Sequence, residues 1–244
     1  MWANKSKAHL TAYFLSGIAL ALVAASILGW AMYYWPHHNS LQFMLTRFFN
    51  VDGEKNIPAS FSTLLLLGAS VLLGRISFMQ FRRKAPFTHW LVLSVGFLMM
   101  AIDEFLSFHE RLMKPVKTLL NVEDVAIFRH AWVIPAALLI LLLIPYFWNF
   151  MRQLPTRTAR MFIIAASLYL GGALGIEVIG GYYASTQGFD FMYKMIATVE
   201  ESLEMAGVIL FIHELMIFIG DSKNWQTKQS ENKIAAESSS EFAG

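Results

Sequence analysis

Six long apolar segments, separated by short polar breaks, constrain the fold of this chain more than any other feature. They lie at about residues 10–34, 59–80, 88–112, 131–150, 161–185 and 191–219. Each is near the roughly 20 residues that an α-helix needs to cross a bilayer, and a backbone in lipid must satisfy its own hydrogen bonds. We therefore predict an all-α fold, a polytopic membrane helix bundle of about six transmembrane helices in contact with the lipid bilayer.

Composition agrees with a membrane protein and excludes several classes of function. The chain is 56% hydrophobic and 15% charged, whereas soluble domains carry about 25% charged residues. It contains no cysteine, which excludes disulfides, thiolate-bound metals and a cysteine nucleophile. The sequence has no phosphate-binding glycine loop and no basic patch, so we expect no nucleic-acid partner.

The first apolar segment and the polar tail set the expected domain limits. Lys5 and Lys7 precede an apolar run that reaches about Trp35. This run is longer than the roughly 7–15 residues of a signal-peptide core, so we predict a retained helix. From Asp221 onward the chain is polar and rich in Ser, Lys and Glu, which is typical of disorder. We predict a transmembrane bundle over residues 1–220 and a disordered tail over 221–244.

Basic residues predict the orientation of the chain in the membrane. With the N-terminus inside, the inner segments carry eleven Lys and Arg residues and the outer loops carry seven. Because cytoplasmic loops carry the excess of positive charge, we predict a multipass protein of the bacterial inner (plasma) membrane with both termini cytoplasmic. The aromatic run from Trp30 to Trp35, followed by His37 and His38, is typical of the outer interface.

Acidic residues interrupt three of the apolar segments. The third, fifth and sixth segments together contain Asp103, Glu104, His109, Glu110, Glu177, Glu200, Glu201 and Glu204. A charge near the bilayer centre costs roughly 3 kcal/mol, and such residues are functional candidates. The predicted directions of these spans place all of them at similar depth, between the midplane and the outer surface. We therefore predict that they share one buried site.

Helical spacing predicts which of these side chains meet. Residues three, four or seven apart share a face of a helix, so Asp103, Ser107 and Glu110 would line one face of a continuous third helix. Glu200 and Glu204 share a face of the sixth. Like charges this close are destabilising, so they need a shared proton, a bound cation or basic partners. The candidate basic partners are Arg111, Arg129, His130 and Lys194.

The excess of carboxylates over basic residues favours a bound cation. Oxygen-rich sites suit hard or borderline ions, so we expect a divalent metal ion: Fe, Mn, Mg, Ca or Zn. The predicted ligands are Asp103, Glu104, His109, Glu110, Glu177, Glu200 and Glu204. Neither His109 nor His213 begins the HExxH motif of zinc proteases. Neither has a glutamate three residues before it, as di-iron bundles require.

Small residues surround the lone acid of the fifth segment, Glu177. Gly171 and Gly175 have GxxxG spacing, and Gly180 and Gly181 follow the glutamate. Small residues let membrane helices approach closely, so we predict that Glu177 lies at a helix–helix interface.

The sequence DEFLSFHE over residues 103–110, together with EESLE over residues 200–204, resembles a family of uncharacterised bacterial six-span membrane proteins. The resemblance covers those two helices and the six-span length, and it implies no known activity. The chain differs from alkaline-ceramidase-like membrane hydrolases, because it lacks their spaced histidine pairs.

Three functions agree with these features. The first is a metal-dependent membrane enzyme, whose metal would activate water or oxygen on a small lipophilic substrate. The second is a proton- or cation-coupled transporter that uses the same carboxylates as relay sites. The third is an accessory or assembly subunit, whose acids pair with basic residues of a partner protein.

Overall fold

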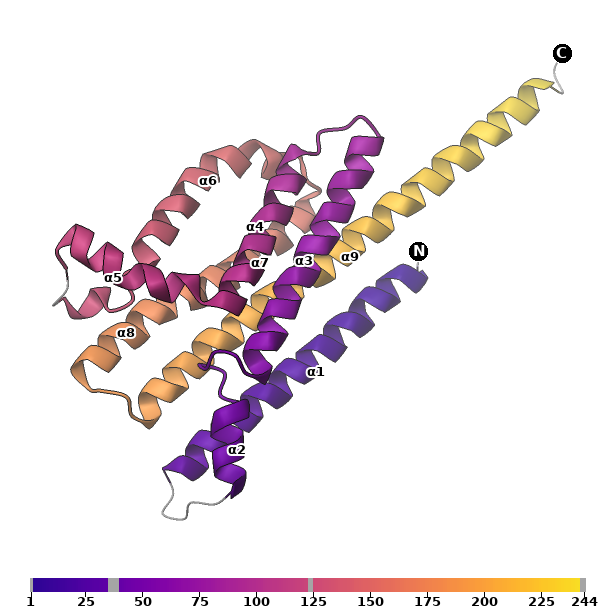
Figure 1. Cartoon of the computed structure of the whole chain (residues 1–244). Coiled ribbons are helices and arrows are strands. Elements are labelled where there is room, and N and C mark those ends of the chain that lie inside the picture. Colours follow the sequence, from indigo (N-terminus) through magenta and orange to yellow (C-terminus); the bar gives the residue numbers. More distant parts are fainter. Residues whose placement is uncertain (1, 35–39, 123–124, 242–244) are drawn as a thin grey trace.

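The structure is a computed structural model that describes residues 2–34, 40–122 and 125–241 of the 244-residue chain. All regular secondary structure within these residues is helical (Figure 1). Six helical stretches are long and apolar enough to cross a membrane: Lys5–Tyr33, Ile57–Arg82, Thr88–Leu106, Val133–Gln153, Thr156–Thr186 and Phe191–Asp221. The prediction of an all-α membrane bundle with about six spans is confirmed, whereas the direction of the spans and the inner-membrane location stay predictions.

Short helices and tight loops join the spans. The elements in chain order are α1 (Trp2–Tyr33), α2 (Ser40–Phe48), α3 (Ile57–Arg82), α4 (Thr88–Leu106), α5 (Phe108–Leu120), η1 (Ala126–Phe128), α6 (Val133–Gln153), α7 (Thr156–Leu170), η2 (Gly171–Ile176), α8 (Glu177–Thr186) and α9 (Phe191–Glu241). His37 and His38 lie outside the described residues.

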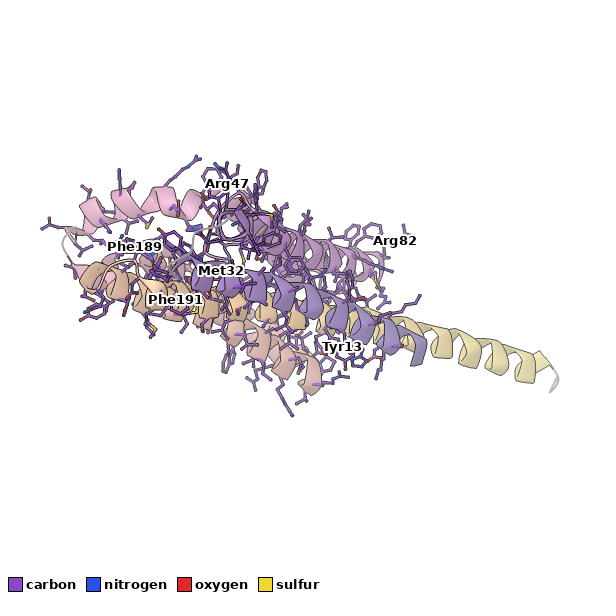
Figure 2. The ribbon with its side chains drawn as sticks, turned by 90° about the horizontal axis from the view of Figure 1, so that it is seen from below. Tyr13, Met32, Arg47, Arg82, Phe189 and Phe191 are labelled. Carbon is purple, nitrogen blue, oxygen red and sulfur yellow. The ribbon has the colours of Figure 1, made fainter. Side chains whose placement is uncertain are left out.

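One end of the bundle gathers the end of α1, the start of α3, and the ends of α4 and α8 (Figure 1). We call it the distal end, because both chain termini lie towards the other end. Figure 2 shows Arg47 and Phe189 towards the distal end and Arg82 towards the opposite one. Between these ends the outer surface is apolar: Tyr13 is 75% exposed and Leu142 is 73% exposed. Such a surface suits contact with lipid.

Helix α9 packs at the centre of the bundle, against α1, α3 and α7. Its side chains Met205 and Leu215 are fully buried. At Gly207 a Cβ atom would lie 2.8 Å from the carbonyl oxygen of Ala165 and 2.8 Å from the backbone nitrogen of Tyr169. The absent side chain therefore lets the backbones of α7 and α9 approach closely. Helix α9 continues to Glu241, and the division of the chain into a bundle and a disordered tail stays a prediction.

The third span is shorter than the sequence predicts. It ends at Leu106, because Ser107 adopts the left-handed conformation (φ 54°, ψ 46°) and α5 begins at Phe108. Asp103 therefore lies on α4 and Glu110 on α5. The expectation that Asp103, Ser107 and Glu110 line one face of a continuous helix is wrong, because the chain turns between them.

The fifth span consists of three pieces rather than one regular helix. α7 passes into the π-helical segment η2 at Gly171, and α8 begins at Glu177. π-helical turns are rare and occur frequently at functional sites. Here the turn comes directly before the acid of this span, and it changes which residues face the neighbouring helix α9.

Candidate functional site

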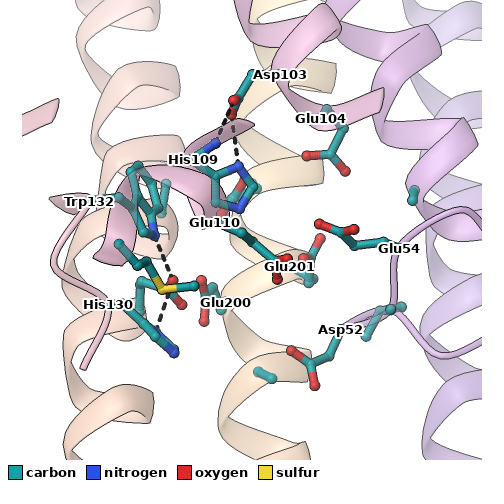
Figure 3. A pocket seen from close by; sticks show the side chains of 18 of the residues that line it. Asp52, Glu54, Asp103, Glu104, His109, Glu110, His130, Trp132, Glu200 and Glu201 are labelled. Atoms are coloured by element: carbon teal, nitrogen blue, oxygen red, sulfur yellow. Dashed lines mark hydrogen bonds and ion pairs between the residues drawn. The ribbon is translucent and has the colours of Figure 1, made fainter. Parts of the chain in front are cut away.

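The distal end of the bundle contains a cavity of about 170 Å³. Side chains from α3, α4, α5, α7, η2, α8 and α9 line it, together with side chains from the loops before α3 and α6 (Figure 3). Its carboxylates belong to Asp52, Glu54, Asp103, Glu104, Glu110, Glu177, Glu200, Glu201 and Glu204, and its imidazoles belong to His109 and His130. All seven residues that the sequence nominates as ligands lie in this cavity. Their convergence is therefore observed, whereas their role as ligands stays a prediction.

Asp103 and His109 form a pair across the break between α4 and α5. The backbone N–H of Ser107 donates to the carbonyl of Asp103 (2.6 Å), which closes the turn. The backbone N–H of His109 donates to Oδ1 of Asp103 (2.9 Å), and Nδ1 of the His109 ring lies 2.8 Å from Oδ2 (Figure 3). Asp103 thus begins α5 and orients the imidazole, and Nε2 is the ring nitrogen that this carboxylate leaves free.

The environment of His109 changes its affinity for a proton. Burial acts to lower the pKa of this imidazole, but the hydrogen bond to Asp103 and the charges of Asp103 and Glu104 outweigh burial, so the pKa is raised. Burial also raises the pKa of the neighbouring Glu110 carboxyl, and the negative charge of Glu54 adds to this effect. The start of α5 therefore binds protons more tightly than the same side chains would in water.

Glu177 and His130 form a second pair of carboxylate and imidazole. Nδ1 of His130 lies 2.9 Å from Oε1 of Glu177, and both side chains are 16% exposed. The indole N–H of Trp132 donates to the same oxygen (3.0 Å). Glu200 lines the same cavity as Glu177 and His130, so the pair lies beside the acids of α9.

Close packing of η2 on α9 places Glu177 beside the α9 glutamates. A Cβ atom on Gly172 would lie 2.8 Å from the carbonyl oxygen of Glu200 and 3.0 Å from Cγ of Glu204. By contrast, a Cβ on Gly171 or Gly175 would meet no atom within 4 Å. The expected interface is present, but the GxxxG pair does not form it. Gly172 faces α9 instead, seven residues after Ala165, which contacts the same helix.

A rigid loop before α3 contributes two more acids, Asp52 and Glu54. The side-chain amide of Asn56 donates to the carbonyl of Asn50 (2.6 Å), which fixes the loop. Lys194 Nζ donates to Oδ2 of Asp52 (2.6 Å). Burial nevertheless raises the pKa of the Asp52 carboxyl, against the lowering effect of the Lys194 charge. Asp52 therefore lies in a setting that disfavours further negative charge.

Two of the four predicted basic partners reach the acids: His130 contacts Glu177 and Lys194 contacts Asp52. The other two lie over aromatic rings. The Arg129 guanidinium carbon is 4.8 Å from the centre of the Phe189 ring, and that of Arg111 is 5.3 Å from the Phe108 ring. The cavity therefore has far more carboxylates than basic groups among its described residues.

Several lining residues were not nominated from the sequence as site residues: Asp52, Glu54, Trp132, Tyr169, Tyr193 and Glu201. Asp52 and Glu54 belong to a loop whose folding over the cavity depends on contacts far along the chain, such as that with Lys194. Tyr169 lies on the fifth span eight residues, or about two turns, before Glu177, and its aromatic character gives no signal of a site. Glu201 belongs to the acidic group that the sequence predicts to share one site, but it is not among the seven predicted ligands.

The arrangement can hold protons or a cation, but it is not a closed coordination shell. Within the part of the chain that the structure describes, no three His, Asp or Glu side chains are gathered closely enough to hold a metal ion as they stand. Binding a metal would require the side chains that line the cavity to turn inwards. Long glutamate side chains, such as Glu104 and Glu204, have the freedom to do so.

The fold and the site together define a multipass α-helical membrane protein with an acidic cavity at one end of its bundle. Residues 15–218 match the family model described as Domain of unknown function (DUF8692), and the chain belongs to that family. Comparisons with curated proteins and with solved structures gave no match. The expected membership of an uncharacterised family is thus confirmed, whereas the bacterial origin and the two family motifs stay predictions.

Proposed function

We propose that the acidic cavity binds a divalent metal ion and that the protein is a metal-dependent membrane enzyme. The observation that carries this proposal is the hydrogen-bonded pair of a cavity histidine and a carboxylate, His109 with Asp103. Histidines that bind metals almost always donate their other ring N–H to a carboxylate or carbonyl, which fixes the tautomer and the orientation of the ring. The pair with Asp103 engages Nδ1 of His109 and leaves Nε2 for a ligand, whereas Nδ1 of His130 lies 2.9 Å from Glu177 without hydrogen-bond geometry.

The charge of the cavity supports the same proposal. Nine carboxylates line a space that contains two imidazoles, and Lys194 is engaged with Asp52. Repulsion among buried carboxylates is costly at low dielectric, and either protons or a cation must offset it. Carboxylates and one or two imidazoles suit Mn²⁺, Fe²⁺ or Zn²⁺.

The residues of the cavity divide into three roles under this proposal. His109, Glu200 and Glu204 would hold the ion, and Asp103 would orient His109. A bound divalent ion would supply a Lewis acid and lower the pKa of bound water. Glu104, on the opposite helix α4, would accept a proton from the reacting water.

Elemental analysis of the protein purified in mild detergent tests the proposal. We expect about one transition-metal ion per chain, and its loss in the double variant Glu200→Gln/Glu204→Gln. The matched control is Asp190→Asn, which changes an acid outside the cavity. A wild-type protein without metal after incubation with Mn²⁺, Fe²⁺ and Zn²⁺, while its melting temperature stays unchanged by each ion, would contradict the proposal.

A second candidate function, cation- or proton-coupled transport, is supported by one specific observation. Glu214 lies on α9 ten residues beyond Glu204, about 15 Å along the axis, and its side chain is fully buried. A buried acid towards each end of the same helix could relay protons. Between them, however, Met205, Val208 and Ile212 are buried and apolar. Transport would therefore need a conformational change.

Reconstitution into liposomes tests this second candidate. With an imposed pH gradient and Mn²⁺ outside, transport predicts Mn²⁺ uptake that is abolished by Glu177→Gln and by Glu214→Gln. Bound metal without uptake would favour the enzyme. Uptake without a stoichiometric bound metal would favour the transporter.

A further inference from the structure

An apolar cavity of about 440 Å³ lies between α4, α6, α7 and α9. Figure 1 shows α6 standing off from α4 and α7, and the cavity occupies this region. Apart from Tyr169 and Trp148, every side chain that lines it is apolar. Its volume falls within the range of about 300–1,000 Å³ that is typical of small-molecule sites. Because α6 packs only loosely on the rest of the bundle, the cavity is accessible from the side that faces lipid.

The apolar cavity and the acidic cavity meet at Tyr169. This residue lines both of them, and it shares the lining of the acidic cavity with Glu204. Gly207 also lines the apolar cavity, one helical turn beyond Glu204, or about 4.5 Å along the axis. A single molecule with a polar head and an apolar chain could therefore occupy both spaces, with the head beside Glu204 and the chain beyond Tyr169.

The charge of the acidic cavity selects the head group. Counted together, Lys194, both protonated imidazoles and one divalent ion would supply five positive charges against nine carboxylates. Like-charge contacts at an interface are unfavourable, so a phosphate or carboxylate head is disfavoured. A protonated amine has the complementary charge, and its three N–H donors match carboxylate acceptors.

We infer that the substrate of this site is a single-chain lipid amine, with its amine in the acidic cavity and its hydrocarbon chain in the apolar cavity between α4 and α6. This inference rests on the proposed function, because it names the substrate class of the same site. The lipid enters sideways from the bilayer, past the loosely packed α6. Tyr169 contacts both the head and the first carbons of the chain.

Tryptophan fluorescence tests the inference, because Trp148 lines the apolar cavity. The full-length protein in phosphatidylcholine nanodiscs is titrated with hexadecylamine brominated in its chain, since bromine quenches indole fluorescence on contact. Hexadecanol and hexadecyl phosphate with the same brominated chain are the matched probes. We expect saturable quenching by the amine at about tenfold lower concentration than by either of the other two. Trp148→Phe should remove most of this signal.

Two substitutions separate the apolar cavity from the general lipid surface. Ala166 lines the cavity and is exposed, so Ala166→Phe fills it without disturbing the core, and should weaken amine binding about tenfold. Leu142 lies on α6 outside the cavity and is 73% exposed, so Leu142→Phe should leave binding unchanged. Equal quenching by all three probes, or equal effects of the two substitutions, would overturn the inference.

Metal analysis of the same preparation distinguishes failure of this inference from failure of the proposed function. A bound metal without saturable quenching by the amine contradicts the lipid amine and leaves the metal site standing. Saturable, amine-selective quenching in a protein that binds no metal contradicts the metal-dependent enzyme. It still supports the lipid amine, because the carboxylates alone provide the complementary charge.

Discussion

Helix α9 carries carboxylates in two places, the half-buried turn Glu200–Glu204 at the distal end and the buried Glu214 ten residues later. Glu214 accepts a hydrogen bond from the Thr158 hydroxyl (2.9 Å) and lies 3.7 Å from the Arg157 guanidinium. The distal turn instead faces other acids across a cavity. Thr158 thus satisfies Oε1 of Glu214, while Oε2 has the charge of Arg157 nearby but no hydrogen bond from a described residue. The distal cavity has nine carboxylates and far fewer basic partners. This difference distinguishes an acid that stabilises the fold from acids that form a binding site.

The largest effect should follow from separating the distal turn from η2. Gly172→Ala places a Cβ 2.8 Å from the carbonyl of Glu200, and overpacking of this kind costs about 1–3 kcal/mol. Gly171→Ala is the matched control, because its Cβ meets no atom within 4 Å. Thermal unfolding in detergent should show a lower melting temperature for the first variant only. Equal melting temperatures would mean that η2 does not press on the distal turn.

Neutralising the distal turn and neutralising Glu214 should change the free energy of unfolding in opposite directions. Glu200→Gln/Glu204→Gln removes repulsion and should raise the free energy of unfolding of the metal-free protein by about 0.5–2 kcal/mol. Glu214→Gln loses the contact with Arg157 and buries an unpaired amide donor, so it should lower that free energy by about 1–3 kcal/mol. Denaturant unfolding of the three proteins measures both. The comparison fails if the double variant is also destabilised.

A smaller effect should follow at the break between α4 and α5. Asp103→Ala removes the acceptor of the His109 backbone N–H, and loss of such a cap costs about 0.5–2 kcal/mol. We expect faster amide hydrogen exchange in residues 108–112 and unchanged exchange in α9, measured by mass spectrometry. Asp103→Asn should restore part of the protection because it retains one acceptor oxygen. Unchanged exchange in both variants would show that another contact begins α5.

The smallest effect should come from Asp190, an exposed acid at the start of α9. A hydrogen bond from the Tyr193 backbone N–H lowers the pKa of this carboxyl below its ordinary value of 3.8. The stabilisation it gives is therefore fully present above pH 3.8 and is lost as pH falls through the lowered pKa. Asp190→Ala should reduce the melting temperature slightly at pH 7, and the difference should vanish at the lowest pH. A difference that grows on acidification would contradict this.

The sequence predicts the convergence of the acids for a simple physical reason. The lengths of the apolar segments define the spans, and successive spans run in opposite directions. The position of a residue along its span then gives its depth in the membrane. By this reasoning Asp103, Glu177 and Glu200 lie at similar depth. This reasoning needs no side-chain detail, which is why it holds for the six spans and for the seven nominated residues.

The local geometry could not be predicted in the same way. DEFLSFHE contains no proline or glycine to mark the break at Ser107, and the left-handed turn there is stabilised by the bonds from Asp103 to the next helix. The π-helical turn likewise leaves no pattern in the apolar periodicity. The GxxxG spacing points to Gly171 and Gly175, but the face of α7 that packs on α9 passes through Ala165 and continues to Gly172, seven residues later.

The π-helical turn η2 makes the fifth span a helix with one residue more than regular winding would contain. Deleting that residue would restore regular winding and rotate everything beyond it by about 100°. Glu177 would then leave His130, while Tyr169 would keep its place beside Glu204. A one-residue insertion is thus enough to bring Glu177 to His130 in a cavity that the Asp103–His109 pair already lines. Such an insertion offers a simple route to the stepwise evolution of the pocket.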